Sequence, residues 1–297
     1  MNAADVMDDV VARLVAAIEA GADTWDMPWR SLGTTGWPIN AATGNRYRGG
    51  NVIALYLVAA DRGYATARWA TYRQWTALGA QVRQGERGTR GIFWKVTERD
   101  TDDDTSDDDN PARQRSAWAR AFTVFNAAQV DNDPRADEAP LDVSPLQRDA
   151  RAEAFFAAVP ATVQWGGGNP CYRPATDDVL MPNFDAFDTA ADAYSTLAHE
   201  LIHWTGHRTR LGRIYGKRFG DDAYAAEELV AELGAAFTCA VVGIATVART
   251  DHAGYLSHWT RMLRAQPAVL WTIASKAQAA TDWLAAYSTT PADLALA

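Results

Sequence analysis

Cysteine is scarce in this 297-residue sequence, and its two cysteines, Cys171 and Cys239, show no spacing typical of a metal or redox motif. We therefore expect buried free thiols in a reducing compartment rather than a disulfide-linked secreted protein. Apolar runs stay short of the roughly 18 residues that a membrane-spanning helix needs. The acidic N-terminal segment lacks the basic region of a secretory signal. These absences predict a cytoplasmic protein with no membrane partner.

Histidine is also rare. The chain has five histidines, and three of them fall between residues 195 and 207. Residues 199–203 read HExxH. His199 and His203 are four positions apart, so on a helix they share one face and can bind the same metal ion. Glu200, beside the first of these ligands, is then placed to act as a general base. By itself, the pentapeptide also fits a helix with two surface histidines.

A second predicted helix carries Glu228 and Glu232, which are also four positions apart. We predict Glu228 as the third metal ligand and Glu232 as the acceptor of an imidazole N–H. Glu227 lies about 100° around an ideal helix from Glu228, so it ranks below Glu228 as a ligand, and its simplest interpretation is a solvated charge. His207 falls two positions short of the third histidine of the metzincin pattern, so we interpret it as a loop residue near the site. The donor set predicts zinc, which the Irving–Williams order favours, with manganese as the alternative.

The charge distribution points to a different partner for the first part of the chain. The net charge of −9 argues against nucleic acid, but residues 27–96 hold ten basic and two acidic residues, a local charge of +8. Seven of the twelve tryptophans lie in the first 118 residues, several beside arginines. Rings stack on unpaired bases and arginines bind phosphates, so this pattern predicts binding of single-stranded DNA. The predicted DNA-binding residues are Trp29, Arg30, Arg46, Tyr47, Arg48, Asn51, Arg68, Tyr72, Arg73 and Arg83.

The predicted elements give an α+β fold with two domains. A single-stranded-DNA-binding domain is expected at residues 1–130, a linker at 131–147 and a zincin-like metallopeptidase domain at 148–297. The Asp-rich run at about 99–112 is expected to be a solvated loop. In the first domain the patterns predict helices at 4–20, 52–60 and 69–78, the second capped by Asn51, and a hairpin that pairs 91–97 with 118–125. Trp75, Phe93 and Trp94 are predicted to lie in the core.

The second domain is predicted to be mainly helical around a small sheet. A strand is expected at 161–165, followed by a hairpin over 172–181. Residues Val179–Met181 are predicted to form the edge strand beside the metal, where a substrate peptide could add as a further strand. Helices are predicted at 147–158, 189–205, 222–242, 251–265 and 267–287.

Longer motifs carry a family resemblance. The first domain resembles the single-stranded-DNA-binding domain of ArdC-type antirestriction proteins and the related plasmid TraC primases, and the second resembles the zincin-like domain of the same family. The matching residues in the first domain are Trp25-x-x-Pro-Trp29, Pro38-x-Asn40, Tyr47-Arg48-Gly49-x-Asn51, Trp69-x-Thr71-Tyr72-x-Gln74 and Leu78-Gly79-x-x-Val82-Arg83-x-Gly85-Glu86. Those in the second are His199-Glu-Leu-x-His203-Trp204-Thr205-Gly206-His207, Arg210-Leu211 and Tyr224-Ala-x-Glu227-Glu228-Leu-Val-Ala-Glu232.

The resemblance implies a protein that binds incoming single-stranded plasmid or phage DNA during transfer and protects it from restriction enzymes, chiefly of type I. Subunits of those enzymes are then possible partners. It also implies a metal-dependent, peptidase-like second domain without fixing its substrate.

Three alternatives stay open at the level of sequence. In the first, the metal is structural and protection comes from covering the DNA. In the second, the protein is a peptidase whose first domain binds protein. In the third, which the single-ion donor set disfavours, it is a metal-dependent nuclease.

Overall fold

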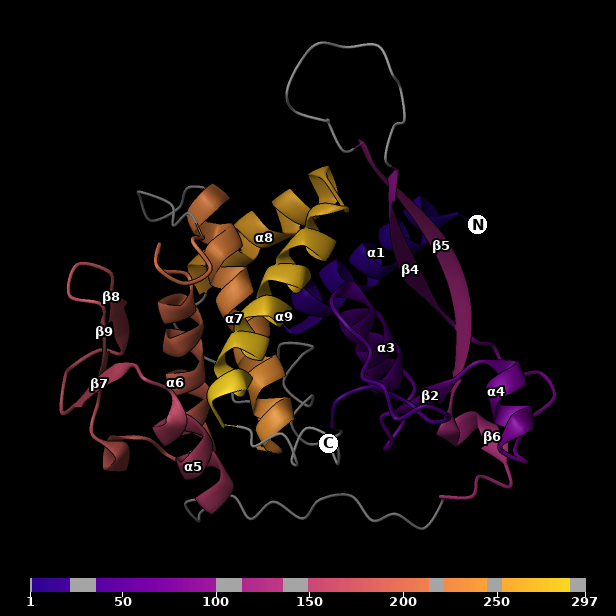
Figure 1. The fold of residues 1–297 in the computed structure, drawn as a ribbon, viewed down its shortest axis with the longest axis horizontal. Coiled ribbons are helices and arrows are strands. Elements are labelled where there is room, and N and C mark those ends of the chain that lie inside the picture. Colours follow the sequence, from indigo (N-terminus) through magenta and orange to yellow (C-terminus); the bar gives the residue numbers. More distant parts are fainter. Residues whose placement is uncertain are drawn as a thin grey trace.

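We describe a computed structural model of the chain, which covers residues 2–21, 36–99, 114–135, 149–213, 222–244 and 253–288 (Figure 1). The predicted acidic loop and most of the predicted linker lie outside these residues. Within them, no helix is both long and apolar enough to cross a bilayer.

The N-terminal domain is built around a long antiparallel hairpin. Strand β4 (Thr89–Arg99) pairs with β5 (Gln114–Asn126) in a register that sets Thr89 opposite Val124 and Arg99 opposite Gln114, which confirms the predicted hairpin. The sheet continues through β2 (Arg68–Ala70) and β1 (Ile39–Asn40) in the order β1-β2-β5-β4. Its inner face packs against two helices, α1 (Ala3–Gly21) and α3 (Gly50–Asp61). A second pair, β3 (Gln81–Val82) and β6 (Val130–Asp131), lies beside α4 (Tyr72–Ala77) and the short helix η1 (Ala127–Gln129).

The predicted helix at 69–78 is wrong in its first turn. Residues 68–70 form β2, in which Trp69 is buried, and α4 begins only after Thr71. The Thr71 side chain accepts from the backbone N–H of Gln74, and the Gln74 side chain accepts from that of Thr71, so a capping box fixes where the helix starts.

The predicted cap at Asn51 is also wrong. Gly49 is the N-cap of α3, and Asn51 lies inside the helix. Its side chain instead accepts from the backbone N–H of Ile92 and donates to the Ile92 carbonyl, both at 2.8 Å. Asn51 therefore fastens α3 to β4.

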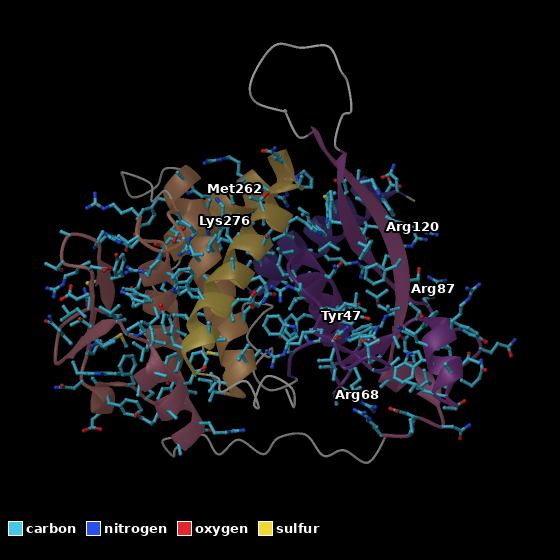
Figure 2. The ribbon with its side chains drawn as sticks, in the orientation of Figure 1. Tyr47, Arg68, Arg87, Arg120, Met262 and Lys276 are labelled. Carbon is cyan, nitrogen blue, oxygen red and sulfur yellow. The ribbon has the colours of Figure 1, made fainter. Side chains whose placement is uncertain are left out.

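Of the three aromatic residues predicted to lie in the core, only one is buried. Trp75 is fully buried as predicted, but Phe93 and Trp94 are 56 % and 47 % exposed. The inward position on β4 is Ile92, and period-2 alternation sends Phe93 to the outer face. Trp94 lies on the same side as Ile92 but stays exposed, because it borders an open cleft beside helix α9 (Val269–Ser288). Phe93 stands opposite Arg120 of β5, so both lie on that outer face, where Figure 2 labels Arg120.

The C-terminal domain joins a three-stranded sheet to a group of helices. The strands are β7 (Thr162–Trp165), β8 (Cys171–Arg173) and β9 (Asp178–Met181), in the order β7-β9-β8. The prediction that residues 179–181 form the edge strand is wrong, because β9 pairs on both sides and Val179 and Met181 are fully buried. Its helices are α5 (Ala150–Ala158), η2 (Phe184–Ala186), α6 (Ala190–Thr205), α7 (Asp222–Val242), α8 (Ala253–Ala265) and α9 (Val269–Ser288).

The two domains share one hydrophobic core. Buried residues of α1 and α3 belong to the same cluster as those of α7 and α9. The Trp37 ring meets Phe237 of α7 edge-on, with ring centroids 5.1 Å apart. At the surface, Arg264 of α8 pairs with Glu19 of α1 at 2.7 Å. Figure 1 shows α1 and α3 lying between the hairpin and the C-terminal helices.

Candidate metal centre

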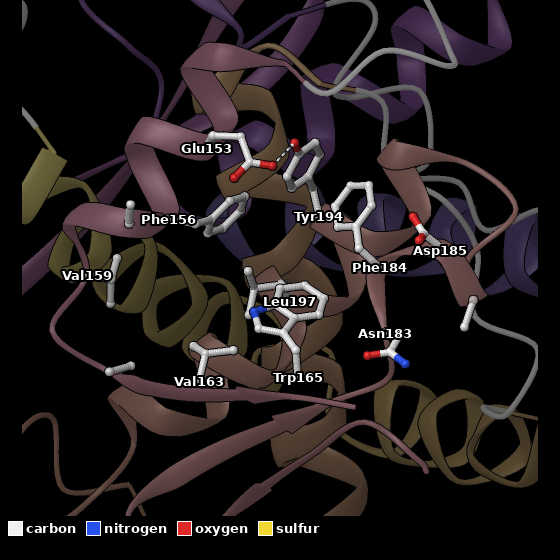
Figure 3. A pocket seen from close by; sticks show the side chains of 13 residues that line it. Glu153, Phe156, Val159, Val163, Trp165, Asn183, Phe184, Asp185, Tyr194 and Leu197 are labelled. Carbon is white, nitrogen blue, oxygen red and sulfur yellow. Dashed lines mark hydrogen bonds between the residues drawn. The ribbon is translucent and has the colours of Figure 1, made fainter. Parts of the chain in front are cut away.

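An aromatic pocket lies on one side of helix α6, and the HExxH histidines lie on the other. The pocket has a volume of about 850 Å³, and its walls include Phe156, Trp165, Phe184 and Tyr194 (Figure 3). The Tyr194 hydroxyl donates to Glu153 at 2.6 Å. On an ideal helix, the two HExxH histidines lie about 140–180° around α6 from Tyr194. The pocket is therefore not part of the metal centre.

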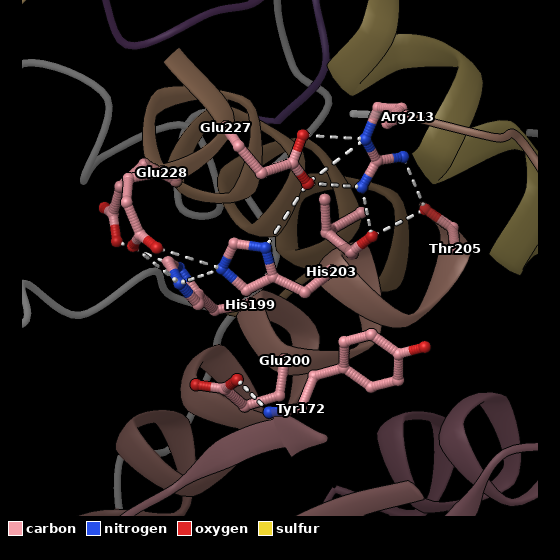
Figure 4. A network of polar contacts seen from close by, with 10 residues as sticks. Tyr172, His199, Glu200, His203, Thr205, Arg213, Glu227 and Glu228 are labelled. Atoms are coloured by element: carbon pink, nitrogen blue, oxygen red, sulfur yellow. Dashed lines mark hydrogen bonds and ion pairs between the residues drawn. The ribbon is translucent and has the colours of Figure 1, made fainter. Parts of the chain in front are cut away.

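The two histidines of HExxH face each other on α6. The helix begins after Thr189, whose hydroxyl accepts from the backbone N–H of Asp192 at 3.1 Å. One turn separates His199 from His203, and their Nε2 atoms are 3.1 Å apart (Figure 4). Both imidazoles are largely shielded from solvent, with 3 % and 11 % of the side chains exposed.

Helix α7 brings a carboxylate to the same point. The oxygens of Glu228 lie 3.6 Å from Nε2 of His199 and 3.6 Å from Nε2 of His203. Close approach of the helices depends on Gly234, because a Cβ there would fall 2.8 Å from the Ile202 side chain of α6. Small Ala231 and Ala235 are also buried on α7.

The donor set fits a divalent ion. One ligand atom from each of His199, His203 and Glu228 lies within 4.8 Å of the others, and all three residues are buried. Across the described residues, this is the only cluster of three or more such side chains. Two imidazole nitrogens and one carboxylate leave room for a fourth ligand, as zinc sites with an open position require. The structure thus brings together the three residues that the sequence predicts as ligands.

A second carboxylate stands behind each imidazole. Glu232 lies 3.1 Å from Nδ1 of His199, where the sequence predicts an N–H acceptor, and Glu227 lies 3.3 Å from Nδ1 of His203. Such contacts favour the tautomer with the proton on Nδ1, so that the Nε2 lone pair points to the shared position. The interpretation of Glu227 as a solvated charge is wrong, because this residue is only 5 % exposed.

Arg213 was not identified from the sequence. It forms an ion pair with Glu227 at 2.9 Å and donates to the Thr205 hydroxyl at 2.8 Å. Burial alone raises the pKa of Glu227, but the hydrogen bonds from His203 and Arg213 outweigh it and leave the pKa below its usual value. Arg213 lies in a stretch without helical or strand periodicity, so only its basic character could have marked it.

Glu200 lies on the side of α6 that faces β8. Its Oε2 accepts from the backbone N–H of Tyr172 at 2.8 Å, and the residue is 4 % exposed. Burial, followed by the nearby Glu200 charge, raises the pKa of the Cys171 thiol. His207 is a loop residue, as predicted, with Nδ1 2.8 Å from the Thr209 hydroxyl.

Several predicted DNA-binding residues have partners inside the protein. Arg68 pairs with Asp133 and donates to the Arg135 carbonyl. Arg83 donates to the carbonyls of Ala128 and Val130. Together with the Asn51 contacts to Ile92, these interactions hold the domain together.

The remaining predicted DNA-binding residues differ in exposure. Arg46 lies over the Trp37 ring at 5.7 Å, and Tyr47 is half-buried. Tyr72, Arg73 and Arg48 are exposed, and Arg48 pairs with Asp282 of α9. Trp29 and Arg30 lie outside the described residues.

The outer face of the hairpin adds residues that the sequence interpretation missed. Phe93 and Trp118 are 56 % and 45 % exposed, with ring centroids 6.5 Å apart, and Arg120 is exposed opposite Phe93. The alternation of Ile92 with Phe93 could have indicated this face.

Both domains are similar to known protein families. Residues 4–125 match the N-terminal domain of anti-restriction factor ArdC, and residues 150–276 match a zincin-like metallopeptidase. The structure is similar to the crystal structure of the antirestriction ArdC protein from the R388 plasmid in its metal-free form, with 36 % identity and a TM-score of 0.79, covering 96 % of this chain and 98 % of that one. The chain belongs to the ArdC family. The Mn(II)-bound structure of the R388 protein gives 34 % identity and a TM-score of 0.77 over the same shares of both chains.

Curated relatives of this ArdC-family chain include the uncharacterized protein y4eC of Sinorhizobium fredii. It is 43 % identical over 282 residues, which are 94 % of this chain and 91 % of the relative. DNA primase TraC of Escherichia coli is 35 % identical over 293 residues. Those residues are 94 % of this chain but only 27 % of the primase, so the similarity covers about a quarter of that enzyme.

Proposed function

We propose that this ArdC-family protein is an antirestriction factor that binds single-stranded DNA and holds one divalent metal ion in its zincin-like domain. The observation that carries the proposal is the convergence of His199, His203 and Glu228 from two helices in a chain that is similar over nearly its full length to an antirestriction protein with a Mn(II)-bound form. The DNA to be protected is incoming plasmid or phage DNA, and the opposing enzymes are type I restriction endonucleases.

The DNA-binding half of the proposal is supported by the outer face of the hairpin. Phe93, Trp118 and Arg120 present two rings and one cation to solvent on the same face. Exposed rings that stack on bases and cations that bind phosphates are the parts of a single-strand binding surface that has little sequence preference.

His199, His203 and Glu228 would hold the ion, which is zinc in our proposal with manganese as the alternative. When bound, a divalent ion supplies a Lewis acid for carbonyl hydrolysis. Glu227 and Glu232 keep the imidazoles in the binding tautomer. Glu200, next to His199 on α6, is our proposed proton acceptor. The strand next to Glu200 is β8, so a peptide substrate would lie along β8 rather than along β9.

One observation favours the second candidate, a non-catalytic DNA-binding protein with a structural metal. The Oε2 atom of Glu200, the proposed proton acceptor, already accepts a hydrogen bond from the Tyr172 backbone N–H, and the residue is almost fully buried. A carboxylate held in this way orients β8 against α6, which is a structural role.

A restriction-protection assay with a purified type I enzyme and unmodified DNA separates the candidates. Glu200→Gln keeps the shape of the side chain and the metal ligands but removes the proton acceptor. Under the catalytic version, protection falls by about tenfold or more, as expected when a general base is lost. Full protection by this variant would leave only the binding protein. A Trp118→Leu/Arg120→Ala variant should lose protection under both versions, and Trp165→Leu, an exposed tryptophan on β7, is its control.

A further inference from the structure

A cleft of about 730 Å³ lies where the N-terminal domain meets α9. Its walls come from both domains, because α1, the start of α3 and β4 line one side and α9 lines the other. None of the residues of the metal centre takes part in it.

Two indoles belong to this cleft. Trp94 of β4 is 47 % exposed and lines the cleft. The Trp271 ring of α9 lies so close to Gly50 that a Cβ there would be 2.5 Å from it. The Nε1 atom of Trp271 is buried and has no hydrogen-bond partner among the described residues. The Trp271 ring is thus packed against the start of α3, and Trp94 is the indole that a ligand in the cleft can reach.

The cleft also has positively charged groups that favour an anion. Arg48 and Lys276 are both exposed on its wall, and Lys276 is labelled on α9 in Figure 2. The 12-residue helix α3 begins here, with Gly49 as an N-cap that has no side chain to cap it and with no acidic residue in the first turn. The N–H groups of Asn51 and Val52 donate to backbone carbonyls at 3.3 and 3.0 Å, and that of Gly49 faces the Gln278 side chain at 3.4 Å. The positive end of the helix dipole, rather than free N–H groups, therefore favours a phosphate here.

We infer that this interdomain cleft binds a nucleotide of single-stranded DNA, with its base against Trp94 and its phosphate between Arg48, Lys276 and the N-terminus of α3. An exposed indole ring beside two cations matches a base and a phosphate, whereas a peptide or lipid would use only part of this set. The inference rests on the proposed function and deepens it, because it adds a DNA-binding site between the domains, on the opposite face of β4 from Phe93.

Asp282 opposes the ligand in this arrangement. It forms an ion pair with Arg48 and also accepts from the Gln278 amide at 2.9 Å. A phosphate has to compete with this carboxylate for Arg48. Removing the charge at Asp282 should therefore strengthen DNA binding, which a purely structural interdomain ion pair would not do.

Anisotropy of a fluorescein-labelled oligothymidylate, titrated with the full-length protein over a series of salt concentrations, tests the inference. Trp94→Leu should lower the affinity roughly 5- to 150-fold, as expected for one stacked base. Lys276→Ala and Arg48→Ala should each reduce the slope of log K against log salt by about 0.7, as expected for one phosphate. Asp282→Asn should bind several-fold more tightly than wild type.

Matched controls are Trp165→Leu, an exposed tryptophan away from the cleft, and Arg208→Ala, an exposed arginine after α6. Both should bind as wild type, and melting temperatures identify any variant that fails to fold. If wild type binds the oligonucleotide but Trp94→Leu and Lys276→Ala bind equally well, the inference is overturned and the proposed function stands. If wild type does not bind, the proposed function fails first. Weaker binding by Asp282→Asn would also contradict the inference.

Discussion

At the scale of single residues, Glu227 shows how a neighbour sets the chemistry of an imidazole. The sequence places it off the face of Glu228 and Glu232, yet it is buried between Nδ1 of His203 and the guanidinium of Arg213. Arg213 compensates the buried charge, which would otherwise be costly. The charge in turn holds the His203 ring in the orientation that a metal ligand needs.

Glu227→Gln should therefore weaken zinc binding by about 10- to 100-fold. The amide keeps the shape and one hydrogen bond but loses the charge that polarises the ring. Competition with a chromophoric chelator measures the affinity. His207→Ala should bind zinc like wild type, because this loop histidine contacts Thr209 rather than the predicted ligands. Equal affinity of the glutamine variant and wild type would contradict a supporting role for Glu227.

Tyr47 predicts a dependence of stability on alkaline pH. Burial raises its pKa to about 12, against a smaller opposing effect of the Asn40 hydrogen bond. The folded state thus holds the proton more tightly than the unfolded state, whose pKa is about 10. The stabilisation that comes from protonated Tyr47 is therefore fully present below about pH 10 and is lost as the pH rises from about 10 to 12. Urea unfolding across this range should show a shallower decline for Tyr47→Phe, and parallel declines would refute the assignment.

At the scale of elements, the metal centre depends on the close contact between α6 and α7. Gly234 gives α7 a flat surface against Ile202, and this brings Glu228 within reach of both histidines. Glycine inside a helix costs about 1 kcal/mol relative to alanine, so this position exchanges helix stability for proximity.

Gly234→Ala separates these two effects. The added methyl group gains about 1 kcal/mol in helix propensity but meets three Ile202 carbon atoms at 2.8–2.9 Å, and overpacking costs about 1–3 kcal/mol. We expect net destabilisation in urea unfolding together with weaker zinc binding. Gly168→Ala is the control, because a Cβ there meets no atom within 4 Å. A more stable Gly234→Ala variant with unchanged zinc affinity would show that α6 and α7 can accommodate a methyl group at this position.

At the scale of the whole molecule, the two domains share a continuous core. Buried residues of α1 and α3 pack in one cluster with those of α7 and α9, and ion pairs such as Glu19–Arg264 cross the boundary. Separating the domains would expose the apolar faces of α1 and α9 to water.

The full chain should therefore unfold in one cooperative transition. Fluorotryptophan NMR can follow Trp69 in the N-terminal domain and Trp259 in the C-terminal domain, since both are buried. Their resonances should disappear at the same urea concentration. Two separate midpoints would mean that the interdomain core contributes little to stability.

The sequence by itself determined the features that depend on local spacing. The pair His199–His203 and the pair Glu228–Glu232 follow from the helical repeat, and the hairpin follows from two strand patterns around an acidic run. Such periodicities arise from backbone geometry, so neighbours along the chain are enough to reveal them.

Only the tertiary structure decided which residues meet across elements. It turned Phe93 outward, placed β9 inside the sheet, joined Asn51 to Ile92 and set Arg213 against Glu227. It also brought α9 next to the N-terminus of α3 and so formed the interdomain cleft. These contacts depend on the packing of segments far apart in the chain, and the physical reason that one sequence cannot reveal them is that burial is a property of the assembled core.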